Sequence, residues 1–456
     1  MGDDDPSKVA LVLAAGLGTR MRSRTAKVLH PVAGSPMLAH VLATVRAAGA
    51  RPVVVLSKES EAARAILPAD VPVAMQDPPR GTGDAVRAAL AAVPDLGGPA
   101  FIVYGDTVLV RPETLRRLER VREERDAVLA LLTGLAGGDS AYGRIVRGSS
   151  GDVERIVEAR VATAKERAIP ESNFGAYAVD LGWLRTAVPR LGPNETGEVF
   201  LTDLVALARR EGRTVAALCL EDPTEGLGVN SRADLAMVDG LVRQRIRERH
   251  MAAGVTFIDP ASSSVEEAVE IAADVTIERG TLLEGRTRIG AGTRIGPYAV
   301  VRDTVVGERC RVEGSVLEGA TLEDEVRVGP FCHLRPGAYL ERGVELGNFG
   351  EVKASRLGAG TKMHHFSYVG DAEVGARVNI GAGTITLNYD GARKNRTEIG
   401  DDAFIGSDTL LRAPVKVGKG AATGAGAVVT KDVPEGMLAV GMPARSIKKY
   451  ARPRKQ

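Results

Sequence analysis

The chain has 456 residues, enough for two or three domains, and its 44% hydrophobic and 26% charged residues are ordinary for a soluble globular protein. A formal net charge of +2 gives no global electrostatic reason for binding nucleic acid or a membrane surface. The sequence has no run of about 18 apolar residues, so we expect no membrane-spanning helix.

The cysteines and the two ends of the sequence bear on its location. Cys219, Cys310 and Cys332 have no CxxC spacing, which favours free thiols in a reducing compartment. The acidic start, residues 1–5, lacks the basic-then-apolar pattern of a signal peptide, so we expect a cytoplasmic protein. The basic tail, residues 448–455, is either a solvated end or a contact for a phosphate-bearing ligand.

Residues 8–230 alternate strand-like and helix-like segments. The predicted strands are Val9–Leu13, Val53–Leu56, Phe101–Tyr104 and Ala127–Thr133, and the predicted helices are Leu38–Ala48, Ser60–Ile66, Ala85–Val93 and Pro112–Arg122. This alternation predicts a Rossmann-like α/β domain with a mostly parallel sheet. Ligands of such sheets bind outside the carboxyl ends of the strands.

A glycine-rich turn, residues 13–21, follows the first predicted strand. Such a turn exposes backbone N–H groups to phosphate, and a helix that starts there favours negative charge. The turn is not a Walker A motif, because no GK[ST] follows, and Met21 stands where a dinucleotide fingerprint needs a glycine. A simple tight turn is the alternative. The nearby cations Arg20 and Lys27 favour a triphosphate ligand.

Residues 231–250 read as one long helix and as a connector. Its apolar stripe consists of Leu235, Val238, Leu241, Val242 and Ile246.

From about Ile277 to Pro434 the sequence repeats every six residues. The period places aliphatic residues at positions such as Ile277, Leu283, Ile289, Ile295, Val301, Leu322, Val328, Leu334, Leu340, Leu346 and Val352. It predicts a parallel β-helix of hexapeptide turns with inward aliphatic side chains and Gly or Asn at the corners. We expect about nine three-sided coils and a rod of about 40 Å. Two breaks are expected, one near residues 303–322 and one at residues 388–396, which reads as a protruding loop.

The rod alone leaves its role open, because hexapeptide rods occur both in acyltransferases and in purely structural modules. Polar side chains that interrupt the repeat favour catalysis: His333, Arg335, Lys353, His364, His365, Tyr368, Asn379, Asn388, Tyr389 and Lys394. Acylation of an amine needs a base near pH 7, and the ordinary pKa of histidine suits that task.

Several motifs together resemble a known family. Residues 13–21 and Lys27-Val28-Leu29 look like the signature of sugar-nucleotide pyrophosphorylases, Gln76 and Gly81-Thr82-Gly83 like their base-reading segment, and Tyr104-Gly105-Asp106 like their metal-binding strand end. Combined with the hexapeptide rod, the chain resembles, over nearly its whole length, the bacterial family of bifunctional N-acetylglucosamine-1-phosphate uridylyltransferases and glucosamine-1-phosphate N-acetyltransferases. The resemblance implies a nucleotidyltransferase domain at 1–230, a linker helix at 231–252 and an acetyltransferase domain at 253–456.

The resemblance also assigns residues of the first site. It implies that UTP and the sugar phosphate are held by Leu13, Ala14, Ala15, Gly16, Arg20, Lys27, Gln76, Gly81, Thr82, Tyr104, Gly105, Gly143, Glu158, Asn173 and Asn230. Asp106 and Asn230 match the Mg²⁺ ligands of the family. Oxygen ligands of this kind suit Mg²⁺, and no protein nucleophile is needed when the sugar phosphate attacks UTP.

For the second site the resemblance implies that His365 is the general base. Glucosamine-1-phosphate would be held by Arg335, Lys353, Tyr368 and Asn379, and acetyl-CoA by Ala382, Asn388, Tyr389, Ser407 and Ala425. The resemblance further implies a left-handed rod, a homotrimer with the acyl site between neighbours, and a product, UDP-N-acetylglucosamine, that feeds cell-wall synthesis. Two alternatives stay open: a pyrophosphorylase with a structural rod, and a non-enzymatic sugar-nucleotide sensor.

Overall fold

The computed structural model describes residues 8–94, 97–136, 142–194 and 197–449. The expectations for the acidic start and for most of the basic tail therefore lie outside the described residues. The chain forms two compact units, Met1–Val242 and Arg243–Gln456.

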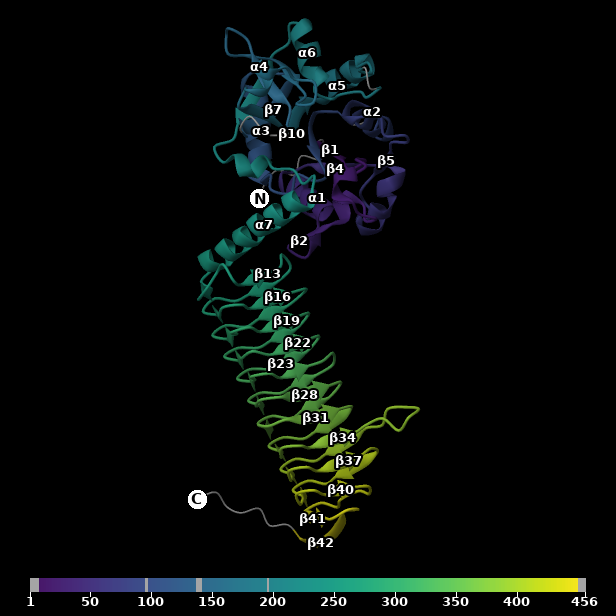
Figure 1. Ribbon diagram of the computed structural model, residues 1–456, viewed down its shortest axis with the longest axis vertical. Helices are drawn as coiled ribbons and strands as arrows, with labels where there is room; N and C mark the ends of the chain where they lie inside the picture. Colours follow the sequence, from purple (N-terminus) through teal and green to yellow (C-terminus); the bar gives the residue numbers. More distant parts are fainter. Residues whose placement is uncertain (1–7, 95–96, 137–141, 195–196, 450–456) are drawn as a thin grey trace. The chain divides into compact units, whose positions relative to one another are not determined.

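The first unit is built on a nine-stranded sheet (Figure 1). Its strands are β1 Val9–Leu13, β4 Arg51–Leu56, β5 Val73–Met75, β6 Pro99–Tyr104, β7 Leu129–Leu135, β8 Arg144–Arg147, β9 Val153–Val157, β10 Glu171–Asp180 and β11 Val215–Cys219. The main order is β11-β7-β10-β6-β1-β4-β5, with β8 pairing with β10 and β9 pairing with β8. A small hairpin, β2 Pro31–Val32 and β3 Ser35–Pro36, lies outside this sheet.

Helices cover both faces of the sheet, which gives the unit two hydrophobic cores. They are α1 Met37–Ala47, α2 Thr82–Ala92, α3 Pro112–Glu124, α4 Ala164–Arg167, α5 Leu181–Ala187 and α6 Asp203–Arg210. Alternate residues of β1 enter opposite cores, Leu11 with Leu204 of α6 in one and Val12 with Leu115 of α3 in the other. This two-sided burial explains why the strand reads as a continuous apolar run.

The structure confirms the predicted α/β class but corrects its detail. Strand β10 runs antiparallel to both β6 and β7, so the sheet is mixed. We predicted no strand there, because nearly all of β10 is buried and the segment shows no polar–apolar alternation. The segment predicted as a helix at Ser60–Ile66 is the 3₁₀ helix Lys58–Ile66, in which only Ser60 and Ala63 are buried.

The predicted connector is helix α7, Arg232–Ala252. The boundary between the two compact units falls inside this helix, at Val242 and Arg243. Across the described ranges, no helix is both long enough and apolar enough to cross a membrane.

The second unit is a rod of three sheets whose strands pair in parallel from coil to coil, except for the final strand (Figure 1). The first sheet contains β12 Thr256–Phe257, β15 Thr276–Ile277, β18 Arg294–Ile295, β21 Arg311–Val312, β24 Arg327–Val328, β27 Glu345–Leu346, β30 Lys362–Met363, β33 Asn379–Ile380, β36 Phe404–Ile405, β39 Ala422–Thr423, β41 Met437–Val440 and β42 Arg445–Lys449. The second contains β13 Ser264–Val265, β16 Leu282–Glu284, β19 Val300–Arg302, β22 Val316–Glu318, β25 His333–Leu334, β28 Gly350–Lys353, β31 Ser367–Gly370, β34 Ile385–Leu387, β37 Leu410–Arg412 and β40 Val428–Val429. The third contains β14 Glu270–Ile271, β17 Arg288–Ile289, β20 Val305–Val306, β23 Thr321–Leu322, β26 Tyr339–Leu340, β29 Arg356–Leu357, β32 Ala372–Val374, β35 Thr397–Ile399 and β38 Val415–Val417.

The aliphatic residues of the six-residue period fill the rod, as predicted. Ile277, Leu283, Ile295, Val301 and Leu340, for example, are completely buried. The rod begins earlier than the repeat suggests, at Thr256, because its first coil departs from the regular spacing.

The break in the six-residue period predicted near residues 303–322 is confirmed as a change of spacing, but it does not interrupt the rod. The coils continue there, and the inward positions Val301, Val306, Val312, Leu317 and Leu322 are all buried. Some of these steps span five residues instead of six, so a corner is shortened without interrupting the sheets. The other break is confirmed, because residues 388–396 leave the rod between β34 and β35 as a protruding loop (Figure 1).

The predicted glycines occupy many corners of the rod with positive φ, such as Gly280, Gly314 and Gly337, but the prediction is incomplete. Many non-glycine residues also occupy corners with positive φ, among them Asp274, Tyr298, Asp303, Arg309, Glu325, Phe331, Phe349, Ala354, Asp371, Arg377, Asp402 and Asp408. Aspartate tolerates this left-handed conformation better than most residues.

Candidate active sites

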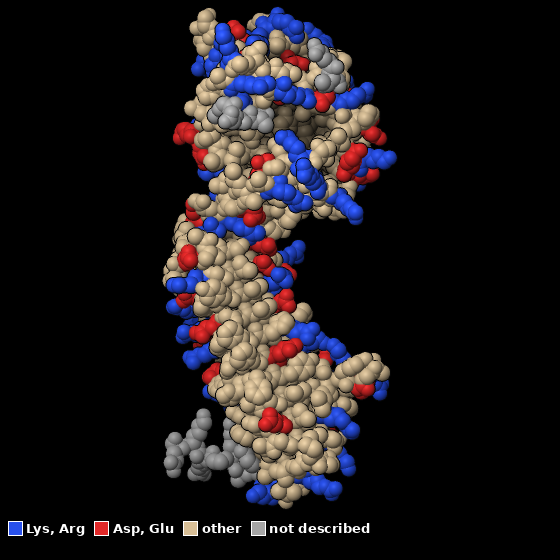
Figure 2. Space-filling model, in the orientation of Figure 1, with Lys and Arg blue, Asp and Glu red and all other residues tan. Residues whose placement is uncertain are grey.

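The glycine-rich turn and Asp106 meet at one edge of the first sheet. β1 and β6 are parallel neighbours with Leu13 opposite Tyr104, and the Gly105 amide donates to the Leu13 carbonyl over 2.9 Å. Residues Ala14, Ala15 and Gly16 therefore leave the sheet beside Asp106. The space-filling view shows a hollow in this unit with Lys and Arg around its rim (Figure 2).

The turn itself is shaped by Gly18. Its φ of +62° is left-handed, and a Cβ there would lie 2.9 Å from the Cβ of Lys27. The close approach holds two short 3₁₀ helices together, η1 Thr19–Met21 and η2 Lys27–Leu29. The α-helix expected directly after the turn is absent from these described residues, so helix-dipole support for phosphate is not provided there.

Two cations and two oxygen donors form the centre of this site. The Lys27 ammonium is ion-paired with the Asp106 carboxylate and lies 3.5 Å from the Asn230 side-chain oxygen. Arg20 donates to the same Asn230 oxygen over 2.9 Å. The Asp106 and Asn230 oxygens thus both face one cation, the Lys27 ammonium. A carboxylate and an amide oxygen turned toward a shared positive charge fit a Mg²⁺ ion, with its preference for oxygen ligands.

The predicted base-reading residues lie together beyond β5. Gln76 is buried, and its amide nitrogen donates to the Gly81 carbonyl over 2.9 Å and to Asp84 over 3.0 Å. Its side-chain oxygen remains for a ligand. Gly81 has a φ of +103° and lies against the Val199 backbone, so a side chain would not fit there. Thr82 accepts a hydrogen bond from the Leu201 amide over 3.0 Å.

The three predicted sugar contacts are also brought together. The backbone N–H of Asn173 donates to the Gly143 carbonyl over 2.8 Å, and Gly143 packs close to the Glu158 side chain. Glu158 accepts from the Thr202 hydroxyl over 3.0 Å, and burial raises the pKa of this carboxyl. Sequence reasoning missed Thr202, which is far from Glu158 along the chain and belongs to no motif.

Asn173 is itself held by a buried tyrosine. Its amide nitrogen donates to the Tyr177 hydroxyl over 2.7 Å. Tyr104 lies next to Tyr177, and burial raises the pKa of both phenols. Both hydroxyls therefore stay protonated and neutral beside the sugar contacts.

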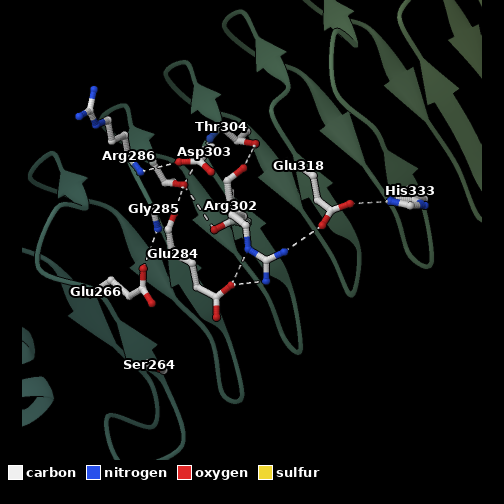
Figure 3. Close-up of polar contacts among 12 residues, drawn as sticks. Ser264, Glu266, Glu284, Gly285, Arg286, Arg302, Asp303, Thr304, Glu318 and His333 are labelled. Atoms are coloured by element: carbon white, nitrogen blue, oxygen red, sulfur yellow. Dashed lines mark hydrogen bonds and ion pairs between the residues drawn. The ribbon is translucent and has the colours of Figure 1, made fainter. Parts of the chain in front are cut away.

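In the rod, three histidines are candidates for a base, and two are already paired. His333 contacts Glu318 over 3.2 Å, at the end of a row in which Arg302 bridges Glu284 and Glu318 (Figure 3). His364 contacts Glu345 over 2.9 Å.

His365 differs from both. It is exposed, and among the described residues it has no hydrogen bond or ion pair. Among the described residues, it is therefore the one of these three histidines whose two ring nitrogens are both open to a ligand.

Three cations gather on the same sheet as Tyr368. Lys353 of β28 lies beside Lys394 of the protruding loop, which lowers the pKa of the Lys353 ammonium, and Arg335 adds a smaller effect of the same sign. Arg335 is also paired with Glu351 over 3.0 Å. Neighbouring ammonium groups that repel one another would be stabilised by a phosphate between them.

Tyr368 and Asn388 are joined directly. The Asn388 amide nitrogen donates to the Tyr368 hydroxyl over 3.2 Å and to the Asp371 carboxylate. Tyr389, the next predicted coenzyme contact, is exposed on the loop and pairs with Lys394 through a β-bridge. Asp371 was not singled out from the sequence, because an aspartate after a strand is an ordinary corner residue.

The other predicted coenzyme contacts form a column along one corner of the rod. The Gly383 amide donates to the Phe366 carbonyl, the Asp408 amide to Ala382, and the Gly426 amide to Ser407, so these corners stack in successive coils. Ala425 occupies the last of these corners. By strand register, Ala382, Ser407 and Ala425 follow His365 in successive coils, so the predicted coenzyme contacts line up with the predicted base.

One predicted contact is separated from the rest. Asn379 lies on β33 of the first sheet, whereas Arg335, Lys353 and Tyr368 belong to the second sheet or follow its strands directly. A corner of the rod lies between the two faces. One chain therefore does not bring Asn379 onto the face of the other sugar-phosphate contacts.

Comparison with known proteins agrees with this two-site arrangement. Residues 10–142 match the family model of the MobA-like NTP transferase domain, and residues 396–431 match that of the bacterial transferase hexapeptide, six repeats. The chain is 47% identical to the bifunctional protein GlmU of Alkalilimnicola ehrlichii over 97% of this chain and 96% of the relative. It is 45% identical to that of Heliobacterium modesticaldum over 97% of each. With the bifunctional protein GlmU of Kineococcus radiotolerans the identity is 44%, over 96% and 90% of the two chains.

Proposed function

The chain belongs to the family of bifunctional GlmU proteins, and we propose which of its residues perform the two reactions by which it makes UDP-N-acetylglucosamine. The protein is an acetyltransferase for glucosamine-1-phosphate and a uridylyltransferase for N-acetylglucosamine-1-phosphate. Its substrates include acetyl-CoA and UTP. The observation that carries this conclusion is a match to bifunctional relatives that spans both units, at 47% identity over 97% of the chain. A pyrophosphorylase with a structural rod and a bare sensor both disagree with it.

In the proposed uridylyl transfer, a phosphate oxygen of the sugar phosphate attacks the α-phosphorus of UTP, and the bond to pyrophosphate breaks. Residues 13–16 and Gln76 orient the nucleotide, and Arg20 and Lys27 balance the charge of the departing pyrophosphate. Glu158 and Asn173 bind the sugar. The support is that these groups surround one edge of the sheet, with Asn173 fixed by Tyr177 and Glu158 fixed by Thr202.

We further propose that Asp106 and Asn230 hold Mg²⁺. The ion would supply positive charge to the phosphate oxygens of UTP. Both side-chain oxygens already face the Lys27 ammonium, which supports the proposal. With Asp106 engaged in that way, Lys27 would pair with a phosphate oxygen of UTP instead.

In the proposed acetyl transfer, His365 removes a proton from the amine of glucosamine-1-phosphate. The nitrogen attacks the thioester carbonyl, the carbon–sulfur bond breaks, and the CoA thiolate takes up a proton. Arg335, Lys353 and Lys394 bind the sugar phosphate together with Tyr368. Coenzyme A runs along the small corners at Ala382, Ser407 and Ala425, with Asn388 and Tyr389 from the loop. The exposure of His365, with both ring nitrogens open to a ligand, supports its role as the base.

We propose a homotrimer whose acetyl-transfer site uses two chains. One support is the separation of Asn379 from Tyr368 on different faces, which a neighbouring chain would overcome. Another is a column of exposed aromatic corners, Phe331, Phe349 and Phe366, in which Phe331 and Phe349 stack with ring centres 5.4 Å apart. An exposed aromatic column of this kind is typical of an interface.

The proposed location is the cytoplasm, where thiols such as Cys310 and Cys332 stay reduced. The proposed functional division is 1–230 for uridylyl transfer and 253–456 for acetyl transfer, with α7 between them.

The test is product formation from glucosamine-1-phosphate, acetyl-CoA, UTP and Mg²⁺, comparing wild type with His365→Ala and Asp106→Ala. We expect His365→Ala to stop CoA release but still to use N-acetylglucosamine-1-phosphate, and Asp106→Ala to do the reverse. His364→Ala is the matched control and should keep acetyl transfer, because its ring is paired with Glu345. A wild type that releases no CoA would overturn the acetyltransferase assignment, and a His365→Ala protein that still releases it would overturn the role of His365.

A further inference from the structure

The amide of Asn388 is fully used as a donor inside the protein. A carboxylate at neutral pH only accepts hydrogen bonds, so the nitrogen of the Asn388 amide must face Asp371. The same nitrogen donates its other hydrogen to the Tyr368 hydroxyl over 3.2 Å. Its backbone is used as well, because the backbone N–H donates to the Thr386 carbonyl over 3.0 Å and the carbonyl accepts from the backbone N–H of Asn395 over 2.7 Å, so among the described residues the side-chain oxygen is the group of Asn388 left for a ligand. Asn388 is therefore part of a protein contact before any coenzyme binds.

Asp371 is the fixed end of this contact. It stands at a corner with a φ of +50°, its amide donates to the Lys353 carbonyl over 3.1 Å, and its carbonyl accepts from the Thr397 amide over 3.2 Å. Thr397 begins the strand that follows the protruding loop. Asp371 thus touches the strand that carries Lys353, the first residue of the loop and the first residue after it.

The space beside the neighbouring Gly370 is filled by the side chains of Tyr368 and Asn388. A Cβ on Gly370 would lie 2.3 Å from the Tyr368 hydroxyl and 2.8 Å from the Asn388 amide nitrogen. The phenol and the amide therefore pack directly against the bare backbone. The two ends of the protruding loop are joined by a backbone hydrogen bond, in which the N–H of Asn395 donates to the Asn388 carbonyl over 2.7 Å.

The same loop brings Lys394 beside Lys353. The two ammonium groups repel each other, and the pKa of Lys353 is lowered chiefly by Lys394, while the Asp371 carboxylate acts in the opposite direction. The negative charge of Asp371 therefore offsets part of the repulsion when no phosphate is bound.

We propose that Asp371 is a positioning residue for acetyl transfer: by holding Asn388, it fixes the Tyr368 hydroxyl and keeps the base of the loop where Lys394 faces Lys353. The inference rests on the proposed acetyl transfer and deepens it, because it joins the sugar-phosphate site and the coenzyme loop through one carboxylate. Loss of the carboxylate should therefore weaken the binding of glucosamine-1-phosphate and of acetyl-CoA together, although the proposal gives Asp371 no direct contact with either substrate.

The test uses Asp371→Gly and Asp371→Asn. Glycine accepts the positive φ without strain but removes the acceptor, whereas asparagine tolerates the same φ and keeps a side-chain oxygen for Asn388. Asp402→Gly is the matched control. Asp402 is also a corner aspartate, with a φ of +61°, but its carboxylate pairs with Arg377 elsewhere on the rod.

We expect Asp371→Gly to raise the KM for glucosamine-1-phosphate and for acetyl-CoA by about tenfold or more, with a smaller change in kcat, because a hydrogen bond to a charged group is lost. Asp371→Asn should restore most of this loss, and uridylyl transfer by the same protein should equal that of Asp402→Gly. Asn388→Ala added to Asp371→Gly should raise the KM for glucosamine-1-phosphate by less than the two separate effects combined, since both changes break one contact. Equal KM values in Asp371→Gly and Asp402→Gly, or additive effects in the double variant, would overturn the proposal.

A second measurement does not depend on catalysis. Hydrogen exchange across residues 388–397 should be faster in Asp371→Gly than in wild type and Asp402→Gly, because the bond that holds the base of the loop is gone. Unchanged exchange would contradict the proposed clamp. A wild type without CoA release would contradict the proposed function instead, and the exchange measurement would still decide whether Asp371 holds the loop.

Discussion

Arg232 donates to Nδ1 of the buried His30 imidazole over 3.3 Å and, through its Nε, to the Met21 carbonyl over 3.3 Å. Met21 ends the short helix that carries Arg20, and His30 follows the one that carries Lys27. Arg232 also lies two positions after Asn230 at the start of α7. One guanidinium therefore ties together the three segments that form the phosphate site.

Replacing this guanidinium should weaken uridylyl transfer without touching acetyl transfer. We expect Arg232→Met to lower kcat/KM for UTP about tenfold. The change removes the charged hydrogen bonds to the Met21 carbonyl and to His30, and relaxation of the two turns should offset part of the lost free energy. His30→Asn, which can place an oxygen near the Nδ1 position, should retain more activity than His30→Leu. Steady-state kinetics of both reactions on the same preparations provide the check, and equal behaviour of the two His30 variants would contradict the predicted hydrogen bond.

The stability of the protein should fall in mild acid partly through His30. Burial and the neighbouring Arg232 lower its pKa below the ordinary value of 6.5. Below about pH 6.5 the His30 side chain of the unfolded chain binds a proton, whereas that of the folded chain stays neutral. The contribution of His30 to stability is therefore fully present above about pH 6.5 and is lost as the pH falls toward the folded pKa. Thermal melting between pH 7.5 and about 5 should decline less steeply in His30→Asn than in wild type. Parallel curves for the two proteins would argue against this contribution.

The three cysteines should react very differently. Cys219 is exposed, whereas burial raises the pKa of Cys310 to about 11 and also raises that of Cys332. A thiol reacts as its thiolate, so one thiol should react rapidly in the native protein at pH 8 and the others only after unfolding. Labelling with a disulfide reagent followed by peptide mass spectrometry measures this. Cys219→Ser should remove the rapid phase, which would also lower the background of assays that detect the CoA thiol; rapid labelling of Cys310 would contradict the buried position.

Two inactive variants should restore each other if the acetyl-transfer site is shared between chains. In a trimer co-expressed from His365→Ala and Asn379→Ala chains, about a quarter of the sites would combine an intact His365 with an intact Asn379 from the neighbour. We expect CoA release well above that of either variant alone. Mixing the two purified homotrimers without chain exchange is the control. Recovery no greater than this control would place all contacts of the site on one chain.

The six-residue period predicts most of the inward positions of the rod. The period places aliphatic residues such as Ile277 and Leu283 inside because a side chain that points inward every six residues has to be apolar in each coil. The six-residue period breaks between Val301 and Leu322, where three inward steps are five residues long, yet the inward row continues. Sheet pairing tolerates a shorter corner as long as the strands keep their register, as Val300 opposite Val316 and Val316 opposite His333 do.

Some residues of the two candidate sites belong to no sequence motif and could not be predicted. Motifs identified Lys27, Asp106 and Asn230 because each belongs to a short segment with recognisable chemistry. Nothing local marked Thr202, Arg232 or Asp371, since their roles come from contacts with residues distant along the chain. Likewise the sequence grouped Asn379 with Tyr368, and only the folded rod separates them onto two faces.

By itself the sequence determined the α/β class of the first unit, the hexapeptide rod and the family, because periodicity and contiguous motifs are local properties of a chain. Tertiary structure alone decided which histidine of the rod is unpaired, which carboxylate holds the loop at Asn388, and that β10 runs against its neighbours. The physical reason is that a hydrogen bond or a strand pairing depends on which distant backbone lies alongside, and folding brings those segments together only after the local pattern has been satisfied.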